Sequence, residues 1–249
     1  MKVIALDAGH GLHTAGKEIT LKGYSRTKEW FLNDRISDRV EELLQDYECQ
    51  VIRVGDTTGQ KDIELAQRVK VANDAGAIVY ISVHHDSGVG GGKGGGTTVY
   101  YYSSSSARKD QAQRLYDAVV AKTGLVGNRF SKVLKNGFYV VKKTKMPAFL
   151  IENGFMDSAT DVPIIITPEH AEKTAQGILD FLVYEYSIEK KKGVQGGNKA
   201  KYEWLLDDCY TLASVGIMNS PEYWAKGEGY SAENTAMLIK NMASYVRGR

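Results

Sequence analysis

The sequence predicts an α/β fold, with a mostly parallel, twisted sheet flanked by helices and a small all-helical domain at the C-terminus. Short, continuous apolar runs alternate with amphipathic stretches, a pattern typical of a parallel sheet that helices cover on both faces. After residue 186 the composition changes to a lysine- and glycine-rich stretch, and helical periodicity then resumes. We therefore expect a first domain at 1–186, a flexible linker at 187–200 and a helical domain at 201–249.

The elements of the first domain follow from the spacing of its apolar residues. Buried strands are predicted at 2–10, 49–55, 77–86, 97–103 and 146–155. Amphipathic helices are predicted at 30–47, 62–76, 110–124 and 167–186. Gly76 and Gly124 stand where helices end, and Thr167 followed by Pro168 is a helix start. These signals define an alternation of strands and helices over most of the chain.

Composition and charge exclude several classes of protein. The chain has 249 residues, of which 43% are hydrophobic and 25% charged, as in ordinary globular proteins. A net charge of +2 is too small to indicate nucleic-acid binding. No apolar run reaches the roughly 18 residues of a membrane span, and the first residues lack the apolar segment of a signal peptide. We therefore expect neither a nucleic-acid nor a membrane partner, and a protein that stays in the cytoplasm where it is made.

Three of the predicted strands end in residues that bind metals or transfer protons. His10 ends the first predicted strand, His84 and His85 lie near the end of the third, and Glu152 lies near the end of the last. In open parallel sheets, functional sites form where the strands reach their carboxyl ends. His10, one of the two adjacent histidines and Glu152 should therefore meet at one edge of the sheet.

Two histidines and a carboxylate around an open position are the ligands of a hydrolytic zinc site. Glu29, near the start of the first helix, is favoured as the third ligand because that helix packs on the sheet, and Glu18 in a glycine-flanked loop is the alternative. Glu152 would then be free to act as a general base, with its pKa raised by apolar surroundings. A structural alternative for Glu152 is a turn cap or an ion pair with Lys142 or Lys143.

Other polar features receive structural interpretations. His13 is expected in a loop and His170 in an exposed helix, with no role in metal binding. The glycine-rich segment 88–96 lacks the order of residues of a phosphate-binding loop, and a strand follows it where a dinucleotide site requires a helix. We expect this segment to be a mobile loop beside the cleft.

Four segments together resemble the zinc-dependent N-acetylmuramoyl-L-alanine amidases of type 3. They are DAGHG (7–11), KEWFLNDR (28–35), SVHHD (82–86) and FLIENGF (149–155), and their order and spacing match that family over about residues 1–185. The resemblance implies one Zn²⁺ held by His10, Glu29 and His84, with Glu152 as catalytic base. It also implies hydrolysis of the amide between the lactyl group of N-acetylmuramic acid and L-alanine in peptidoglycan.

The same resemblance selects His84 over His85 as the ligand, from its place after Ser82. His85 and Asp86 depart from the family's usual residues at these two positions. A role for His85 in binding metal or substrate therefore stays open at this point.

The whole chain resembles a bacteriophage endolysin, with a wall-cleaving domain, a linker and a small C-terminal module. Such an enzyme would wait in the host cytoplasm until a holin opens the membrane, and would then lyse the host by cleaving its wall. The C-terminal domain would bind the cell-wall polymer through aromatic side chains, and its small size allows an oligomer to form through it. Those aromatic residues are Tyr202, Trp204, Tyr223, Trp224 and Tyr230. The alternatives are a zinc peptidase or carboxypeptidase acting within the stem peptide, and a wall-binding protein without catalysis.

Overall fold

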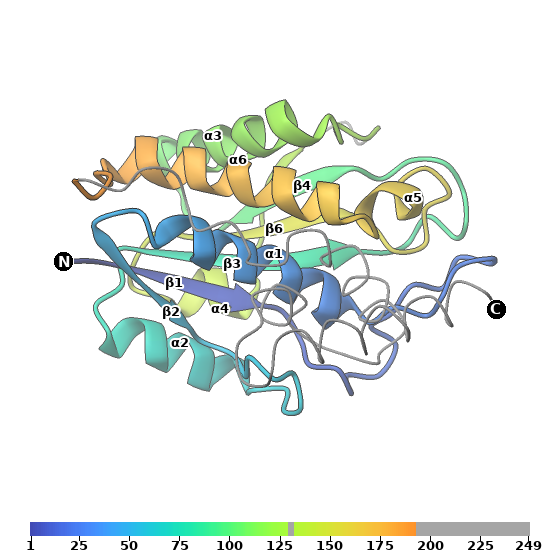
Figure 1. Ribbon diagram of the computed structural model, residues 1–249, viewed down its shortest axis with the longest axis horizontal. Helices are drawn as coiled ribbons and strands as arrows, with labels where there is room; N and C mark the ends of the chain where they lie inside the picture. The colour runs from blue at the N-terminus through green and yellow to red at the C-terminus, as the bar shows by residue number, and fades with distance from the viewer. Residues whose placement is uncertain (129–131, 193–249) are drawn as a thin grey trace, which may run out of the picture.

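A six-stranded sheet between two layers of helices forms the body of the protein (Figure 1). The computed structural model describes residues 1–128 and 132–192. The α/β architecture predicted from the sequence is confirmed for this part of the chain. The helical domain expected at 201–249, with its aromatic wall-binding candidates and its possible oligomer contact, lies outside the described residues.

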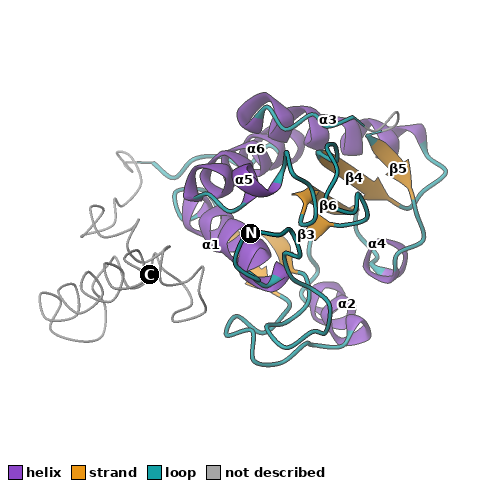
Figure 2. Cartoon of the chain, turned by 90° about the vertical axis from the view of Figure 1, so that its right-hand side faces the viewer, coloured by secondary structure: helices purple, strands orange, loops and turns teal. Residues whose placement is uncertain are grey.

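The sheet is mostly parallel, as predicted. Its strands lie in the order β2-β1-β3-β6-β4-β5. Among the described pairings only that of β4 with β6 is antiparallel, so β4 and β5 run opposite to the other four strands. The strands are β1 (Lys2–Ala8), β2 (Cys49–Arg53), β3 (Val79–Asp86), β4 (Thr97–Tyr101), β5 (Val133–Lys135) and β6 (Ala148–Phe155). Because β1, β3 and β6 are parallel, they end at the same edge of the sheet, which faces the viewer in Figure 2.

Helices cover both faces of the sheet (Figure 2). The described helices are α1 (Glu29–Leu44), α2 (Leu65–Asp74), α3 (Ser106–Thr123), α4 (Tyr139–Lys143), α5 (Val162–Ile165) and α6 (Pro168–Tyr186). The long helices α1, α3 and α6 pack on one face, and α2 and α4 pack on the other. This double covering explains why the strands read as continuous apolar runs.

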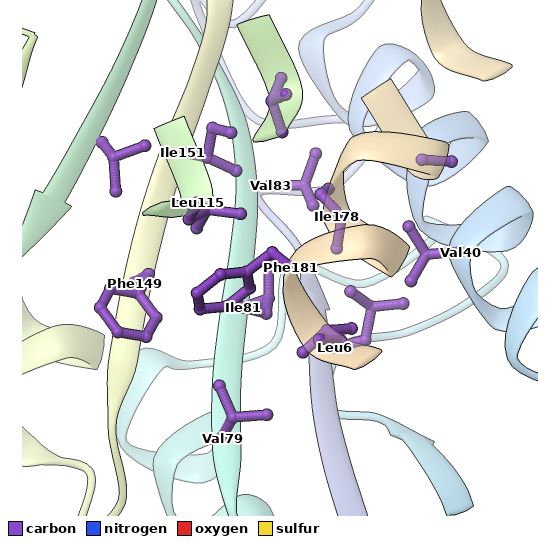
Figure 3. Packing of buried hydrophobic residues seen from close by; sticks show 14 of the residues in the cluster. Leu6, Val40, Val79, Ile81, Val83, Leu115, Phe149, Ile151, Ile178 and Phe181 are labelled. Carbon is purple, nitrogen blue, oxygen red and sulfur yellow. The ribbon is translucent and has the colours of Figure 1, made fainter. Parts of the chain in front are cut away.

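The two cores use alternate residues of each strand. Leu6, Ile81 and Ile151 point toward Ile178 and Phe181 of α6, as Figure 3 shows. Residues between them in sequence, such as Ala5, Tyr80 and Leu150, belong to the core beneath α2 and α4. Side chains of a strand alternate between its faces, so the face of every strand residue is fixed once one is known.

Several short elements were not predicted. The three-residue strand β5 and the helices α4 and α5, of five and four residues, are too short to show a clear hydrophobic period. The predicted helix ends are confirmed: α3 stops at Gly124, with φ of 69°, and Thr167 caps α6 by accepting a hydrogen bond from the amide of His170 at 3.1 Å.

The segment after α6 keeps contact with the sheet domain. Ile188 is buried, the amide of Glu48 donates to the carbonyl of Glu189, and the amide of Lys191 donates to the carbonyl of Asp46. The start of the stretch expected to be a linker is therefore packed against the first domain. Within residues 1–128 and 132–192, no helix is both long and apolar enough to cross a bilayer.

Candidate active site

The carboxyl ends of β1, β3 and β6 bring the predicted site residues together. Ala8, two residues before His10, pairs with Val83, and His84 pairs with Glu152 across β3 and β6. The expected convergence at one edge of the sheet is thus present.

Three of these side chains form a compact group that could hold a metal ion. Potential ligand atoms of His10, Glu29 and His84 all lie within 4.8 Å of one another. The imidazole Nε2 of His10 is 3.3 Å, and Nδ1 of His84 is 3.0 Å, from the carboxylate Oε1 of Glu29. The two imidazole rings meet edge to face with centroids 4.9 Å apart. We refer to these three side chains as the His–Glu–His group.

The position of Glu29 follows from where α1 begins. Glu29 is the first residue of the helix, and its backbone amide donates to the carbonyl of Lys17 at 2.9 Å. Its carboxylate is 1% exposed and accepts hydrogen bonds from the amide of His85 and the side chain of Asn33. The ammonium of Lys17 lies 3.6 Å from its other oxygen, Oε2, which accepts no hydrogen bond from the described residues.

Charge within the group shifts the pKa of its members. Burial raises the pKa of Glu29, but hydrogen bonds and attraction from His10 and His84 outweigh it and hold that pKa far below its usual value. Burial lowers the pKa of His84, but the facing carboxylate of Glu29 outweighs it, so the pKa of His84 is raised. A carboxylate between two imidazoles therefore stays ionised, as a metal ligand must be.

The turn that carries His10 has an unusual backbone, since His10 has a φ of 67°. The buried guanidinium of Arg68 holds this turn by donating to the carbonyl of Ala8 at 2.8 Å and that of His10 at 2.9 Å. The same group pairs with the buried carboxylate of Asp7 at 2.5 Å. The backbone strain at His10 is thus offset by hydrogen bonds from α2, the helix that contains Arg68.

Gly9 allows His84 to reach the group. A Cβ atom at this position would lie 2.1 to 2.5 Å from three atoms of the His84 ring. Any larger side chain would force the imidazole away, so glycine is required at position 9 by close approach.

Glu152 lies beside the group without belonging to it. Burial raises the pKa of Glu152 to about 8, despite the opposing effect of the His84 charge, and its Oε2 has no hydrogen-bond partner among the described residues. The predicted increase in pKa is therefore present. No ion pair of Glu152 with Lys142 or Lys143 occurs in the described part of the chain, and both lysines lie in α4, against the opposite end of β6.

The alternative ligands do not join the group. Glu18 pairs with Arg26 and Lys28 on the surface. His85 is 2% exposed, and its Nδ1 lies 2.8 Å from the side-chain oxygen of Asn33. Burial lowers the pKa of His85 well below its ordinary value, so its imidazole is neutral.

The expectation that His170 is exposed is wrong. His170 is 3% exposed, and its Nε2 donates to the backbone carbonyl of Asn153 at 3.2 Å. His170 is the first residue of a buried stripe on α6 that continues through Thr174 and Ile178. The spacing of four residues places them on one face of the helix, and this pattern could have revealed the burial of His170 from the sequence. His13 lies in an exposed loop, as predicted.

The glycine-rich loop at 88–96 is anchored by carboxylates. The amides of Gly88 and Gly90 donate to Asp157, and that of Gly96 donates to Asp161. The mobility expected from its glycine content is opposed by these hydrogen bonds. Its positive φ angles, including 124° at Gly88 and 60° at Gly90, explain the choice of glycine.

Sequence reasoning missed the residues that support the group. Asn33 and Arg68 donate hydrogen bonds to the turn that follows β1, and the ammonium of Lys17 approaches the carboxylate of Glu29 from a neighbouring loop. Asn33 stands four residues after Glu29 on the same helix, a signal available in the sequence. Arg68 is about 60 residues from its partners, and nothing local indicates the contact.

The His–Glu–His group fits a zinc ion by its chemistry. Neutral imidazoles and a carboxylate are the nitrogen and oxygen ligands that Zn²⁺ prefers, and three protein ligands leave one position for water or substrate. The oxygen Oε2 of Glu29 is buried and accepts no hydrogen bond from the part of the chain that the structure describes, so it is available to a cation.

The fold and this group define an α/β domain of the hydrolase type, and comparison with known proteins gives the family. The family profile described as N-acetylmuramoyl-L-alanine amidase matches residues 4–184, so the chain belongs to the N-acetylmuramoyl-L-alanine amidase family.

Individual relatives agree with this assignment. The chain is 28% identical over 186 residues to the "Probable cell wall amidase LytH" of Staphylococcus aureus, with 75% of this chain and 59% of that protein covered. It therefore spans about three fifths of the length of that relative. The catalytic domain of CwlV, an N-acetylmuramoyl-L-alanine amidase from Bacillus (Paenibacillus) polymyxa var. colistinus, is similar with a TM-score of 0.65 and 28% identity, over 76% of this chain and 100% of that one. An N-acetylmuramoyl-L-alanine amidase from Clostridium difficile 630 has a TM-score of 0.66 and 26% identity, over 77% and 98% of the two chains.

Proposed function

We propose that this protein hydrolyses the amide between the lactyl group of N-acetylmuramic acid and the L-alanine of the stem peptide in bacterial peptidoglycan. The observation that carries the proposal is the meeting of the His–Glu–His group and Glu152 at one edge of the sheet, in a chain of the amidase family. His10, Glu29 and His84 would hold one Zn²⁺. When bound there, zinc would polarise the scissile carbonyl and make a water molecule more acidic.

Glu152 would be the general base of this reaction. Its oxygen Oε2, which has no hydrogen-bond partner among residues 1–128 and 132–192, could take a proton from the attacking water, and the same carboxyl could then deliver that proton to the leaving amine of L-alanine. Asn33 and the amide of His85 hold Glu29, and Arg68 holds the backbone of His10, so these residues keep the ligands in place during the reaction.

The bond that is cut gives the test of this proposal. Purified peptidoglycan is digested with the full-length protein, and the newly exposed amino termini are labelled and identified. Amidase activity exposes N-terminal L-alanine, whereas a peptidase acting within the stem would expose a different amine. Treatment with a chelator should abolish the reaction and added zinc should restore it. Digestion without any new alanine terminus would reject the amidase proposal.

We also propose that the protein acts as an endolysin of a bacteriophage. The support is the composition break after Tyr186 and the renewed helical pattern at 201–249, which suit a linker and a wall-binding module. In this role the protein would accumulate in the host cytoplasm, reach the wall after holin action and lyse the host. Purified protein should then sediment with bacterial walls. Replacement of the aromatic residues within 201–249 should weaken this sedimentation without changing the cleavage of soluble wall fragments. Unchanged sedimentation of those variants would contradict the binding role.

A further inference from the structure

We propose that His85 is a positioning residue, whose ring fixes the side-chain amide of Asn33 in the orientation that holds Glu29. The inference rests on the proposed function, because it concerns Glu29 as a metal ligand. His85 is one of the residues that depart from the family pattern, and the structure places it against α1 rather than in the His–Glu–His group.

The alternation of side chains along β3 separates the roles of the two adjacent histidines. Ile81 and Val83 lie on the face that packs against α1 and α6, and His85 continues that row. The side chain of His84 points to the opposite face of the strand, where it contributes to the His–Glu–His group. A histidine at position 85 is therefore directed at the helix that carries Glu29.

Asn33 ties three parts of the site together. It is fully buried, one helical turn after Glu29. Its side-chain nitrogen donates to the carbonyl of Gly9 at 3.1 Å and to Oε1 of Glu29 at 3.4 Å. Its side-chain oxygen lies 2.8 Å from Nδ1 of His85. The amide thus bridges the turn that carries His10, the ligand Glu29 and strand β3.

Only one orientation of this amide satisfies every neighbour. If the Asn33 amide were reversed, its oxygen would face the carbonyl of Gly9 and the carboxylate of Glu29, and no proton would lie between these acceptors. In the observed orientation the oxygen of Asn33 requires a donor, and Nδ1–H of His85 supplies it. A buried amide oxygen without that donor would be left unsatisfied, which favours other positions of the Asn33 side chain.

Within the described part of the chain, the ring of His85 has no hydrogen bond that competes with its contact to Asn33. Its Nε2 is buried without a partner among the described residues, and its neighbour His170 lies at a centroid distance of 6.4 Å. Its backbone amide also donates to Oε1 of Glu29, at 3.2 Å. His85 therefore acts on Glu29 twice, directly through its backbone and through Asn33 by its side chain.

Two substitutions of equal chemistry test the ring contact. His85→Asn places an amide donor close to the position of Nδ1, whereas His85→Gln carries the same group farther out, near the position of Nε2. The full-length protein is freed of metal, and zinc affinity is measured by competition with a chromophoric chelator. We expect His85→Gln to weaken zinc binding roughly 10- to 100-fold and His85→Asn to stay within about 3-fold of the unsubstituted protein. Thermal melts of the metal-free variants verify that both are folded.

A double-mutant cycle with Asn33→Ala separates positioning from packing. If His85 acts through Asn33, His85→Gln should change zinc affinity by less than about 2-fold in the Asn33→Ala background. Additive effects of the two substitutions, or equal affinities for His85→Gln and His85→Asn, would overturn the inference while leaving the proposed function intact. Absence of zinc binding by the unsubstituted protein would overturn the proposed function, and the inference with it.

Discussion

Glu152 lies directly opposite His84 in the parallel pairing of β6 with β3. The adjacent strands therefore set the separation between the proposed base and one proposed ligand, and no flexible loop intervenes between them. Sites built on regular elements hold their side chains more accurately than sites on loops. The pairing also explains how a charged residue can occupy a buried strand, because its carboxylate lies at the edge where the histidines converge.

Replacing Glu152 by glutamine should separate catalysis from metal binding. Glu152→Gln keeps the size of the side chain but removes its ability to accept a proton, so hydrolysis of peptidoglycan should fall about 10²- to 10⁴-fold. Zinc content should stay unchanged, because Glu152 is outside the His–Glu–His group. The matched control is Glu18→Gln, in which the carboxylate pairs with Arg26 and Lys28 and is not part of the His–Glu–His group. A Glu152→Gln variant with the original rate would exclude the general-base role.

Adding a methyl group at Gly9 should disturb the site through His84. A Cβ atom there would lie 2.1 Å from Cε1 of His84, a distance that no side-chain adjustment short of moving the imidazole relieves. Gly9→Ala should therefore weaken zinc binding by at least about tenfold, as measured by chelator competition. Gly137→Ala is the control, since its nearest neighbouring atom is 4.0 Å from the added carbon. Equal zinc affinities of these two variants would show that the close approach of Gly9 to His84 has no effect on the site.

Sequence patterns located most of the candidate site because strand ends are local features. His10, His84 and Glu152 each follow or end an apolar run, and parallel strands bring such ends together. The sequence favours Glu29 over Glu18 because Glu29 stands near the start of a helix that packs on the sheet. In the structure Glu29 lies with His10 and His84, whereas Glu18 pairs with Arg26 and Lys28.

The supporting contacts could not be predicted in the same way. The hydrogen bonds of Arg68 to the turn at His10 depend on how α2 docks, which no spacing in the sequence encodes. The strand β5 was missed because three residues cannot show alternation. The expectation that His170 is exposed was wrong because His170 belongs to the buried stripe of α6, together with Thr174 and Ile178.

Removing the positive charge of Lys17 should strengthen metal binding. Its ammonium lies 3.6 Å from Oε2 of Glu29 and repels any cation that approaches this oxygen. The side chain is 42% exposed, so solvent screens the effect, and Lys17→Met should raise zinc affinity by only about 2- to 5-fold at low salt. The gain should shrink as ionic strength rises. Lys22→Met, in an exposed turn, is the control for net charge. A weaker affinity in Lys17→Met would instead indicate that the ammonium stabilises the site.

Acid should destabilise the protein through His170. Burial, together with the charge of Arg35, lowers the pKa of His170 to about 4 from an ordinary 6.5. Between pH 6.5 and 4 the unfolded chain therefore binds a proton at His170 that the folded protein does not bind, so the free energy of unfolding falls as the pH drops through this range. Above pH 6.5 this contribution is constant. For His170 alone the total loss is on the order of 3 kcal/mol.

The contribution of His170 can be isolated by substitution. His170→Gln retains a donor for the carbonyl of Asn153 but cannot be protonated, so its unfolding free energy should decline less between pH 6.5 and 4 than that of the unsubstituted protein. Urea denaturation of the two metal-free proteins at several pH values measures how steeply the unfolding free energy of each changes with pH. Taking the difference between the two proteins cancels the contribution of the other histidines. Identical slopes for His170→Gln and the unsubstituted protein would mean that His170 is protonated in the folded state as readily as in the unfolded chain.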